Sequence, residues 1–311
     1  MKNMNNQELL DSVENEILKH KENYSENQIK ELIEIFNEII NVKTENADNI
    51  GDRYIDAIGN DHSGTYFFEN VWTIDLLIKI LDASDNLSVQ VHPEDDYARE
   101  NENGELGKTE CWYVLDAKAG AKLVYGHTAK TKEEFNDKIN REQWQELFIE
   151  EEVKAGDFFY IPAGTLHAIG EGILIYEVQQ NSDTTYRVYD YDRVDKDGNK
   201  RELHIEKTKD VTKVPFEKVT TSPREEKLEG ATVTHLADEK YFSVFKVEVE
   251  GQVSLEKTRT GNLFTVLNGS GSVEIEGSIY DVKKGDSFIL TTDCSKYTLK
   301  GNMFLVGSYD R

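Results

Sequence analysis

The sequence predicts a mainly β protein, a barrel or sandwich whose fold occurs twice in the chain. From Thr65 onward, short apolar segments alternate with turns rich in Gly, Asn and Asp, which is typical of antiparallel β-barrels and sandwiches. The chain also contains an internal repeat, because KAGDFFYI at 154–161 matches KKGDSFIL at 283–290. Each copy has a lysine, a Gly-Asp turn and an apolar strand. The repeat predicts a duplicated β fold.

The N-terminal residues have a different pattern. Residues 7 to 42 predict two amphipathic helices, and the second begins with Ser25 followed three residues later by Gln28, as in a capping box. The apolar stripe of that helix consists of Ile29, Leu32, Ile33, Phe36 and Ile39. We therefore expect a helical N-terminal segment over residues 1–45, which docks either on the β fold or on another subunit.

A first β domain is expected over residues 46–210. One small helical insertion interrupts its strands at about residues 131 to 149, where Thr131 and Glu134 are placed to cap a helix. The residues before this insertion and after it keep the pattern of short strands, so the helix is an addition to a β fold.

A second β domain is expected over residues 211–311. Its first part, residues 214–231, contains two prolines and has the composition of a connector. Aligning the two copies of the repeat places Lys296 opposite His167. If the fold is duplicated, the second copy has therefore lost a metal ligand at this position and is structural.

Charge and composition exclude several kinds of partner. The 311 residues carry a formal net charge of −24, which repels nucleic-acid phosphates and anionic lipid. The longest apolar stretches, such as TIDLLIKIL, are too short and too charged to cross a bilayer. The N-terminus has no apolar signal region, so a cytoplasmic protein is expected, with Cys111 and Cys294 as reduced thiols. An anionic ligand would need a local cluster of Arg and Lys.

A functional face is predicted in the stretch LSVQVHPEDDY at 87–97. Side chains of a strand alternate between its two faces, so Ser88, Gln90 and His92 point one way. The apolar residues Leu87, Val89 and Val91 point the other way, toward a core. Polar side chains at two-residue spacing at the end of a strand indicate a binding site.

Three further stretches supply partners for this face. GKTECWYV at 107–114 places Lys108 and Glu110 on one face of a strand and turns Cys111 to the other. IPAGTLHAIGEG at 161–172 offers His167 after a turn, and IYEVQQNSDTTYRVYDYDR at 175–193 offers Glu177 and two arginines. Imidazoles, a carboxylate and an amide oxygen together predict a metal site with N and O ligands. Zinc accepts such ligands, and two His with one carboxylate also suit non-haem iron, so the residue types leave the metal open.

These motifs together resemble the type I mannose-6-phosphate isomerases, in particular the short bacterial form. LSVQVHP, NGELGKTECWYV, GDFFYIPAGTLHAIG and EVQQNSDTTYRVYDYDR occur in the family's order and with similar spacing. The resemblance covers roughly residues 73 to 206 strongly and the remainder more loosely. It implies two cupin (jelly-roll) domains and a zinc-dependent interconversion of mannose 6-phosphate and fructose 6-phosphate, with Fe²⁺, Mn²⁺ or Co²⁺ as other possible metals.

The resemblance also implies roles for individual residues. His92, Glu110 and His167 match the family's metal ligands, and Gln90 matches a fourth ligand or a substrate contact. The catalytic residues by this comparison are Arg187, Glu177 and Lys108. The substrate's phosphate would be received by Ser88, Arg187 and Arg193.

The implied reaction explains these residue types. Aldose–ketose isomerisation moves a proton between C1 and C2 through a cis-enediol, and a cation stabilises the charge that builds on the two oxygens. A base must remove the proton, and Glu177 or a metal-bound water would fill that role, with Lys108 or Arg187 assisting at oxygen. Arginine suits a phosphate because its planar fork donates two parallel hydrogen bonds.

The N-terminus departs from the family pattern. The Glu-x-x-Trp-Gly-Gly and Gly-Glu-x-Trp stretches of the family do not occur, and residues 7 to 42 with DRYIDAIGNDHSGTYFFENVW stand in their place. The chain is therefore expected to be an isomerase with a rebuilt pocket wall or, alternatively, a non-catalytic sugar-phosphate-binding or regulatory relative. A cupin oxygenase would instead contain iron and consume oxygen. The expected assembly is a monomer or a homodimer.

Overall fold

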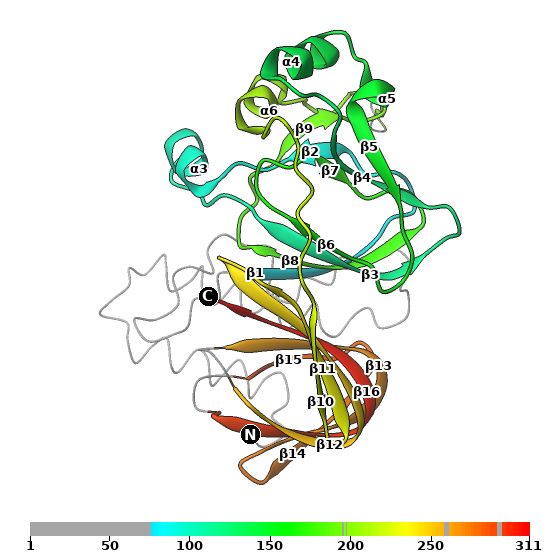
Figure 1. The fold of residues 1–311 in the computed structure, drawn as a ribbon, viewed down its shortest axis with the longest axis vertical. Coiled ribbons are helices and arrows are strands. Elements are labelled where there is room, and N and C mark those ends of the chain that lie inside the picture. The colour runs from blue at the N-terminus through cyan, green and yellow to red at the C-terminus, as the bar shows by residue number, and fades with distance from the viewer. Residues whose placement is uncertain (1–75, 195, 197, 258–260, 291–293) are drawn as a thin grey trace. The chain divides into compact units, whose positions relative to one another are not determined.

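The computed structural model describes residues 76–194, 196, 198–257, 261–290 and 294–311. The predicted N-terminal helices lie outside these residues. Within them the chain is mainly β, as predicted, and its strands form three sheets (Figure 1). The sheets stay open in the part that the structure describes, so the strands build sandwiches and no closed barrel. No helix among the described residues is long and apolar enough to span a membrane.

Two sheets make up the first half of the described chain. The four-stranded sheet has the order β1-β8-β3-β6, and the five-stranded sheet has the order β5-β4-β7-β2-β9. The strands are β1 (Leu76–Asp82), β2 (Val89–Val91), β3 (Glu110–Ala117), β4 (Lys122–His127), β5 (Phe148–Glu152), β6 (Phe158–Ile161), β7 (His167–Ala168), β8 (Ile173–Gln180) and β9 (Tyr186–Tyr189). Strands that are far apart in sequence therefore become neighbours, and this brings the predicted motifs together.

Four helices accompany these strands: α3 (Asp95–Asn101), α4 (Lys132–Asn140), α5 (Trp144–Leu147) and α6 (Ile205–Val211). The predicted cap of the insertion is confirmed, because Thr131 Oγ1 accepts a hydrogen bond from the Glu134 amide at 3.2 Å. The insertion ends earlier than predicted, because the chain enters strand β5 at Phe148. Helices α3 and α6 were not predicted from the sequence.

The second half of the described chain forms a seven-stranded antiparallel sheet. Its order is β10-β11-β12-β16-β13-β14, and β15 pairs with β13. The strands are β10 (Arg224–Leu228), β11 (Ala231–Asp238), β12 (Phe242–Glu256), β13 (Asn262–Ile275), β14 (Ser278–Lys283), β15 (Ser287–Leu290) and β16 (Lys296–Asp310). Strand β10 lies inside the stretch predicted to be a connector.

The two halves share one pairing scheme. In the first half β8 pairs with β1 and β3, while β7 pairs with β2 and β4. In the second half the single long strand β16 makes the corresponding pairs with β12 and β13. Strands β14 and β15 flank β13 as β5 flanks β4 and β6 flanks β3. The second half therefore repeats the first with its short strands fused into long ones.

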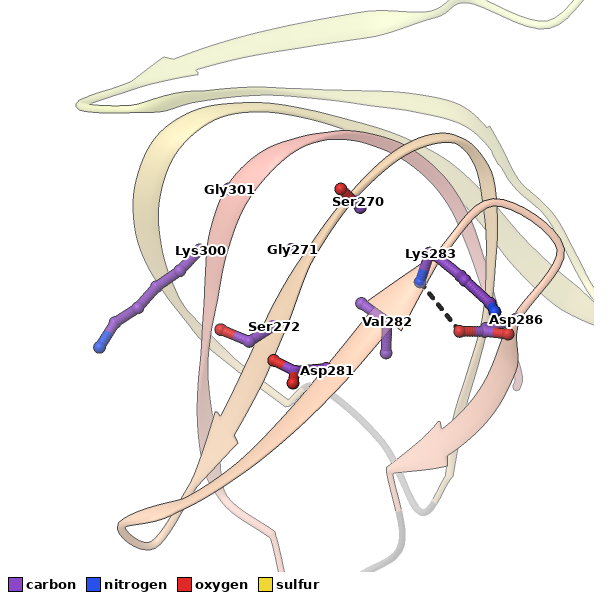
Figure 2. A pocket seen from close by; sticks show the side chains of 9 residues that line it. All are labelled: Ser270, Gly271, Ser272, Asp281, Val282, Lys283, Asp286, Lys300 and Gly301. Carbon is purple, nitrogen blue, oxygen red and sulfur yellow. Dashed lines mark hydrogen bonds between the residues drawn. The ribbon is translucent and has the colours of Figure 1, made fainter.

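The repeated sequence motif has the same backbone geometry in both copies. The amide of Lys154 donates to the carboxylate of Asp157 at 3.0 Å. In the second copy the amide of Lys283 donates to the carboxylate of Asp286 at 2.9 Å, and Figure 2 shows this turn. The glycine between each Lys and Asp, Gly156 or Gly285, has a φ of +92° or +94°, which a side chain would disfavour. These matching turns support the predicted duplication.

Apolar packing covers both faces of the first half's strands. One buried cluster lies between its two sheets and includes Trp112, Tyr125 and Ile175. Another lies where α4, α5 and α6 cover the five-stranded sheet and includes Phe135 and Leu166. The cores leave one region between the two sheets that is polar, and the predicted site residues lie there.

The reverse face of the four-stranded sheet packs on the second half. Cys111, Tyr113, Tyr176 and Val178 from β3 and β8 share a buried cluster with Phe242 and Val306 from β12 and β16, among others. The Tyr176 hydroxyl lies 3.3 Å from Thr265 Oγ1. Both cysteines are buried free thiols. The expected domain boundary at residue 210 falls inside helix α6, and the domain limits stay a prediction.

Candidate metal centre and active site

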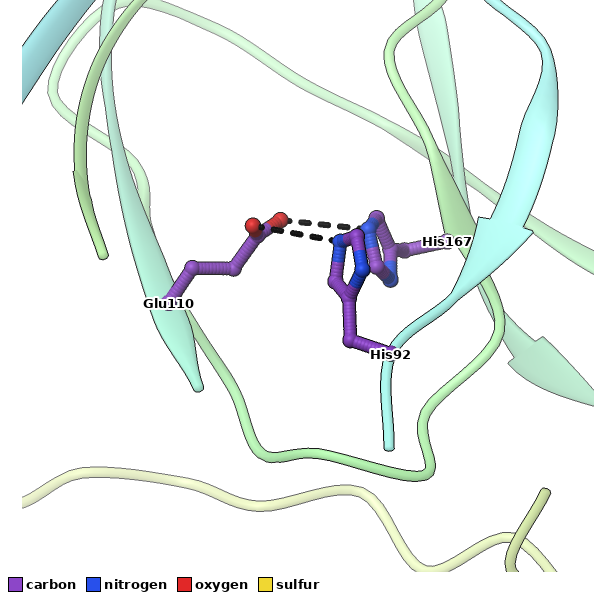
Figure 3. A group of neighbouring side chains, drawn as sticks. All are labelled: His92, Glu110 and His167. Carbon is purple, nitrogen blue, oxygen red and sulfur yellow. Dashed lines mark ion pairs between the residues drawn. The ribbon is translucent and has the colours of Figure 1, made fainter. Parts of the chain in front are cut away.

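His92, Glu110 and His167 come together in the structure (Figure 3). His92 follows the last residue of β2, Glu110 opens β3 and His167 opens β7, so three strands from two sheets contribute one side chain each. His167 Nε2 lies 3.1 Å from one oxygen of Glu110, and His92 Nε2 lies 3.5 Å from the other. All three side chains are buried. The sequence predicted this convergence.

Backbone carbonyls fix the orientation of both imidazoles. His92 Nδ1 donates to the Thr184 carbonyl at 2.8 Å, and His167 Nδ1 donates to the Thr165 carbonyl at 2.9 Å. A carbonyl oxygen only accepts, so Nδ1 carries a proton, and in the neutral form of either ring Nε2 would have a free lone pair. This is the tautomer that binds a metal, held by the kind of backbone partner that metal-ligating histidines have.

The chemistry of the three ligand atoms fits a cation. Both Nε2 atoms and Glu110 Oε1 are buried without a hydrogen-bond partner. Burial, with a smaller effect of Lys108, lowers the pKa of His92 to about 3, which keeps the ring neutral. Lone pairs that face one another in a dry interior are unfavourable unless a cation lies between them. Among the described residues this is the one such cluster of His, Cys, Asp and Glu.

Gln90 lies beside this cluster. In the five-stranded sheet it pairs with His167 on one side and with Arg187 on the other, so the three side chains project from the same face. Its side chain is half-buried. Its role as a fourth ligand stays a prediction.

Leu87 does not lie where the sequence predicted. Val89 and Val91 are fully buried, as expected, but Leu87 is 38% exposed. Strand β2 begins only at Val89, so the alternation of faces does not extend back to Leu87. The prediction that Leu87 belongs to the core was wrong.

Glu177 is buried and held by two donors. Lys79 Nζ donates to its Oε1 at 3.0 Å, and the Trp112 indole N–H donates to its Oε2 at 2.8 Å. Burial, followed by the nearby charge of Glu110, raises the pKa of Glu177. A carboxyl with a raised pKa is suited to proton transfer near neutral pH.

Sequence reasoning did not identify Lys79 or Trp112 as partners of Glu177. Lys79 lies in β1 opposite Glu177, and its ammonium also donates to Gln179. The available signal was a single lysine within the apolar stretch of β1, with a side chain that proves to be only 13% exposed. A charge in such a strand indicates a buried partner.

Lys108 points into the same region. Only 5% of the residue is exposed, and its ammonium lies 3.4 Å from Thr185 Oγ1. Burial and the positive charge of Lys79 lower the pKa of Lys108 to about 8. The amine therefore changes its protonation state closer to neutral pH than an ordinary lysine does.

The predicted phosphate residues divide into two groups. Arg187 Nε donates to Ser88 Oγ at 3.3 Å, so these two side chains are together. Arg193 instead donates to Asp190 and to the backbone carbonyl of Asn86. Arg201, which sequence reasoning did not identify, donates two hydrogen bonds to the same Asp190. Arg193 and Arg201 bind Asp190, and Arg187 lies near enough to interact electrostatically with all three residues, so the region is locally cationic.

Comparisons with known proteins agree with this geometry. A family model described as "Phosphomannose isomerase type I, catalytic domain" matches residues 41–115, and one described as "Mannose-6-phosphate isomerase, cupin domain" matches residues 232–310. The mannose-6-phosphate isomerase ManA of Bacillus subtilis (strain 168) is 49% identical over 226 residues, which are 73% of this chain and 72% of the relative. The chain belongs to the type I mannose-6-phosphate isomerase family.

Solved structures show the same family and fold. The crystal structure of the mannose 6-phosphate isomerase from Bacillus subtilis is 44% identical and has a TM-score of 0.73, with 75% of this chain and 74% of that chain covered. A mannose 6-phosphate isomerase structure described as zinc-bound is 15% identical, with a TM-score of 0.61 over 76% of this chain and 79% of that chain. At that identity it shows the fold alone. The predicted cupin-type fold is confirmed.

Proposed function

We propose that the protein is a metal-dependent aldose–ketose isomerase that interconverts mannose 6-phosphate and fructose 6-phosphate. The observation that supports this most is the cluster of buried, unpartnered ligand atoms of His92, Glu110 and His167. Lys108 and Glu177, which share the polar region between the two sheets, have pKa values shifted toward neutrality. Membership of the isomerase family supports the same reaction.

The proposed cofactor is one divalent cation per chain, zinc in the first place. His92, Glu110 and His167 would hold it, with Gln90 as the fourth protein ligand, and Fe²⁺, Mn²⁺ or Co²⁺ would suit the same N and O atoms. When bound, such a cation acts as a Lewis acid that stabilises negative charge on the sugar's oxygens. The second half of the chain is proposed to be structural, because the core between its strands consists of apolar side chains such as Phe264, Tyr297 and Leu305.

The other residues would handle the proton and the phosphate. Glu177 would take the proton from C2 of mannose 6-phosphate and return it to C1, while Lys108 assists the transfer of a proton from O2 to O1. Arg187 and Ser88 would bind the phosphoryl group, with Arg193 beside them. The arginine cluster gives an anionic substrate a local attraction that a chain of net charge −24 otherwise lacks.

A coupled assay tests this proposal. Purified protein is loaded with zinc and incubated with mannose 6-phosphate, and the formation of fructose 6-phosphate is followed. We expect turnover that a chelator abolishes and that added zinc restores. Thermal stabilisation by mannose 6-phosphate without turnover would support the alternative, a non-catalytic sugar-phosphate-binding protein. Iron in the purified protein together with oxygen consumption would support an oxygenase.

Replacing Arg187 with alanine is expected to raise the KM for mannose 6-phosphate by about 10- to 100-fold with a smaller change in kcat, since a hydrogen bond between charged groups contributes about 1.5–3 kcal/mol. Arg187→Lys should fall between the parent and the alanine variant, because it keeps the charge and loses the planar fork. Steady-state kinetics measure this, with Arg224→Ala on the exposed strand β10 as the matched control. An unchanged KM in Arg187→Ala would exclude Arg187 from phosphate binding.

A further inference from the structure

Trp112 contacts both the proposed general base, Glu177, and one proposed metal ligand, His167. Its indole N–H donates to Glu177 Oε2 at 2.8 Å, and its ring lies edge-on to the His167 ring, with centroids 5.4 Å apart and an interplanar angle of 77°. Trp112 is 1% exposed, and the hydrogen bond is buried. A tryptophan whose only role is packing would leave its N–H to an arbitrary acceptor, whereas this N–H meets a carboxylate at the centre of the site.

We propose that Trp112 is a positioning residue that holds the carboxylate of Glu177 in the orientation needed for proton transfer. The proposal rests on the proposed isomerase function and adds to it a residue that does not touch the substrate. The two parts of the Trp112 side chain have different roles. The indole N–H orients Glu177, and the indole ring packs in the apolar cluster between the two sheets.

The strand register makes this contact direct. Trp112 in β3 and Glu177 in β8 are cross-strand partners, so donor and acceptor leave neighbouring backbones at the same level of the sheet. The indole has few rotatable bonds, and its N–H therefore has one fixed direction. Lys79 donates to the other carboxylate oxygen, Oε1, through an ammonium on a flexible side chain, and this ammonium also donates to Gln179. The orientation of the carboxylate thus depends mainly on Trp112.

Loss of the N–H would free the carboxylate without removing it. Glu177 Oε2 is held by Trp112 in a buried environment, where an unpaired charged oxygen is costly. Only the bond from Lys79 to Oε1 would then hold the carboxylate, which could rotate about that contact. A rotated base transfers its proton more slowly, although substrate and metal are still bound.

The test is Trp112→Phe, which keeps an aromatic ring against His167 and removes the N–H. We expect kcat for mannose 6-phosphate to fall about 10- to 100-fold, with KM within about 3-fold and zinc content equal to that of the parent. Trp144→Phe is the matched control, because Trp144 stacks on Phe148 and Tyr189, neither of which is a proposed site residue. Its kcat should equal that of the parent.

A double-mutant cycle tests whether Trp112 affects kcat through Glu177. If Trp112 acts through Glu177, adding Trp112→Phe to Glu177→Gln should cause no further loss of kcat. An unchanged kcat in Trp112→Phe, a loss that is fully additive with Glu177→Gln, or a loss explained by missing zinc would each overturn the inference. In these cases the parent remains active and the isomerase function stands. A zinc-loaded parent without turnover would instead remove the proposed function, and this inference with it.

A variant that fails to fold does not end the test. Benzothienylalanine at position 112 replaces the indole N–H by sulfur at nearly the same volume, so it preserves the packing and removes only the hydrogen bond. The expected fall in kcat is the same as for Trp112→Phe, and parental kcat in this protein would equally overturn the inference.

Discussion

Replacing His167 with alanine is expected to abolish both metal binding and isomerisation. Without His167 the proposed site keeps one imidazole, one carboxylate and the weak amide ligand Gln90, which should lose the cation to a chelator. The cation's stabilisation of the reacting oxygens is worth several kcal/mol, so kcat/KM should fall by about 10³-fold or more. The effect should be large because His167 is completely buried and its Nδ1 is already fixed by the Thr165 carbonyl. Among the described residues no further His, Cys, Asp or Glu belongs to this cluster and could replace His167 as a ligand.

Metal analysis and the coupled assay together check this expectation. Parent protein should contain about one zinc per chain, and His167→Ala should contain little, with a circular dichroism spectrum that shows a retained β fold. His235→Ala on strand β11 is the matched control and should keep both zinc and activity. A His167→Ala protein with parental zinc content and turnover would contradict the proposed metal centre.

Replacing Glu177 with glutamine is expected to lower kcat by about 10²- to 10⁴-fold, the usual contribution of a general base. The zinc content should stay at the parental level, because Glu177 is not one of the three clustered ligands. Part of the loss has a structural cause. Lys79 and Trp112 both donate to the carboxylate, and the amide nitrogen of glutamine would face one of these donors without accepting from it.

Steady-state kinetics separate the two causes. Glu177→Asp keeps two acceptor oxygens on a shorter side chain, so it should retain more activity than the glutamine variant if proton transfer matters most. Glu150→Gln in the exposed part of β5 is the control and should behave as the parent. Isomerisation at the parental rate in Glu177→Gln would exclude Glu177 as the base and leave a metal-bound water in that role.

The cluster of His92, Glu110 and His167 was predictable from sequence because each of these residues stands at a strand end in a motif of its own. His92 precedes a proline, and His167 follows a Gly turn, so local patterns marked both as unusual. The residues around them were not predictable in this way. Lys79, Trp112 and Arg201 acquire their roles from partners about 10 to 100 residues away, and a single sequence does not show which strands become neighbours.

The short helices were missed for a related reason. Helices α3 and α6 have seven residues each and no side-chain cap, so their sequences carry weak helix signals. Contacts with the rest of the protein stabilise them, as where Tyr97 of α3 donates to Asp210 of α6. By contrast, α4 has a capping threonine and two buried residues at helical spacing, and it was predicted correctly.

The two faces of strands β3 and β8 have different roles. One face carries Glu110 and Glu177, and the reverse face packs against Phe242 and other side chains of the second half. The described residues of the second half therefore support the two strands that carry the proposed catalytic groups. Exchange of one buried aromatic there, such as Phe242, for another is expected to disturb the packing beneath both strands. Substitutions in this apolar cluster are therefore expected to change activity although their side chains lie on the face opposite Glu110 and Glu177.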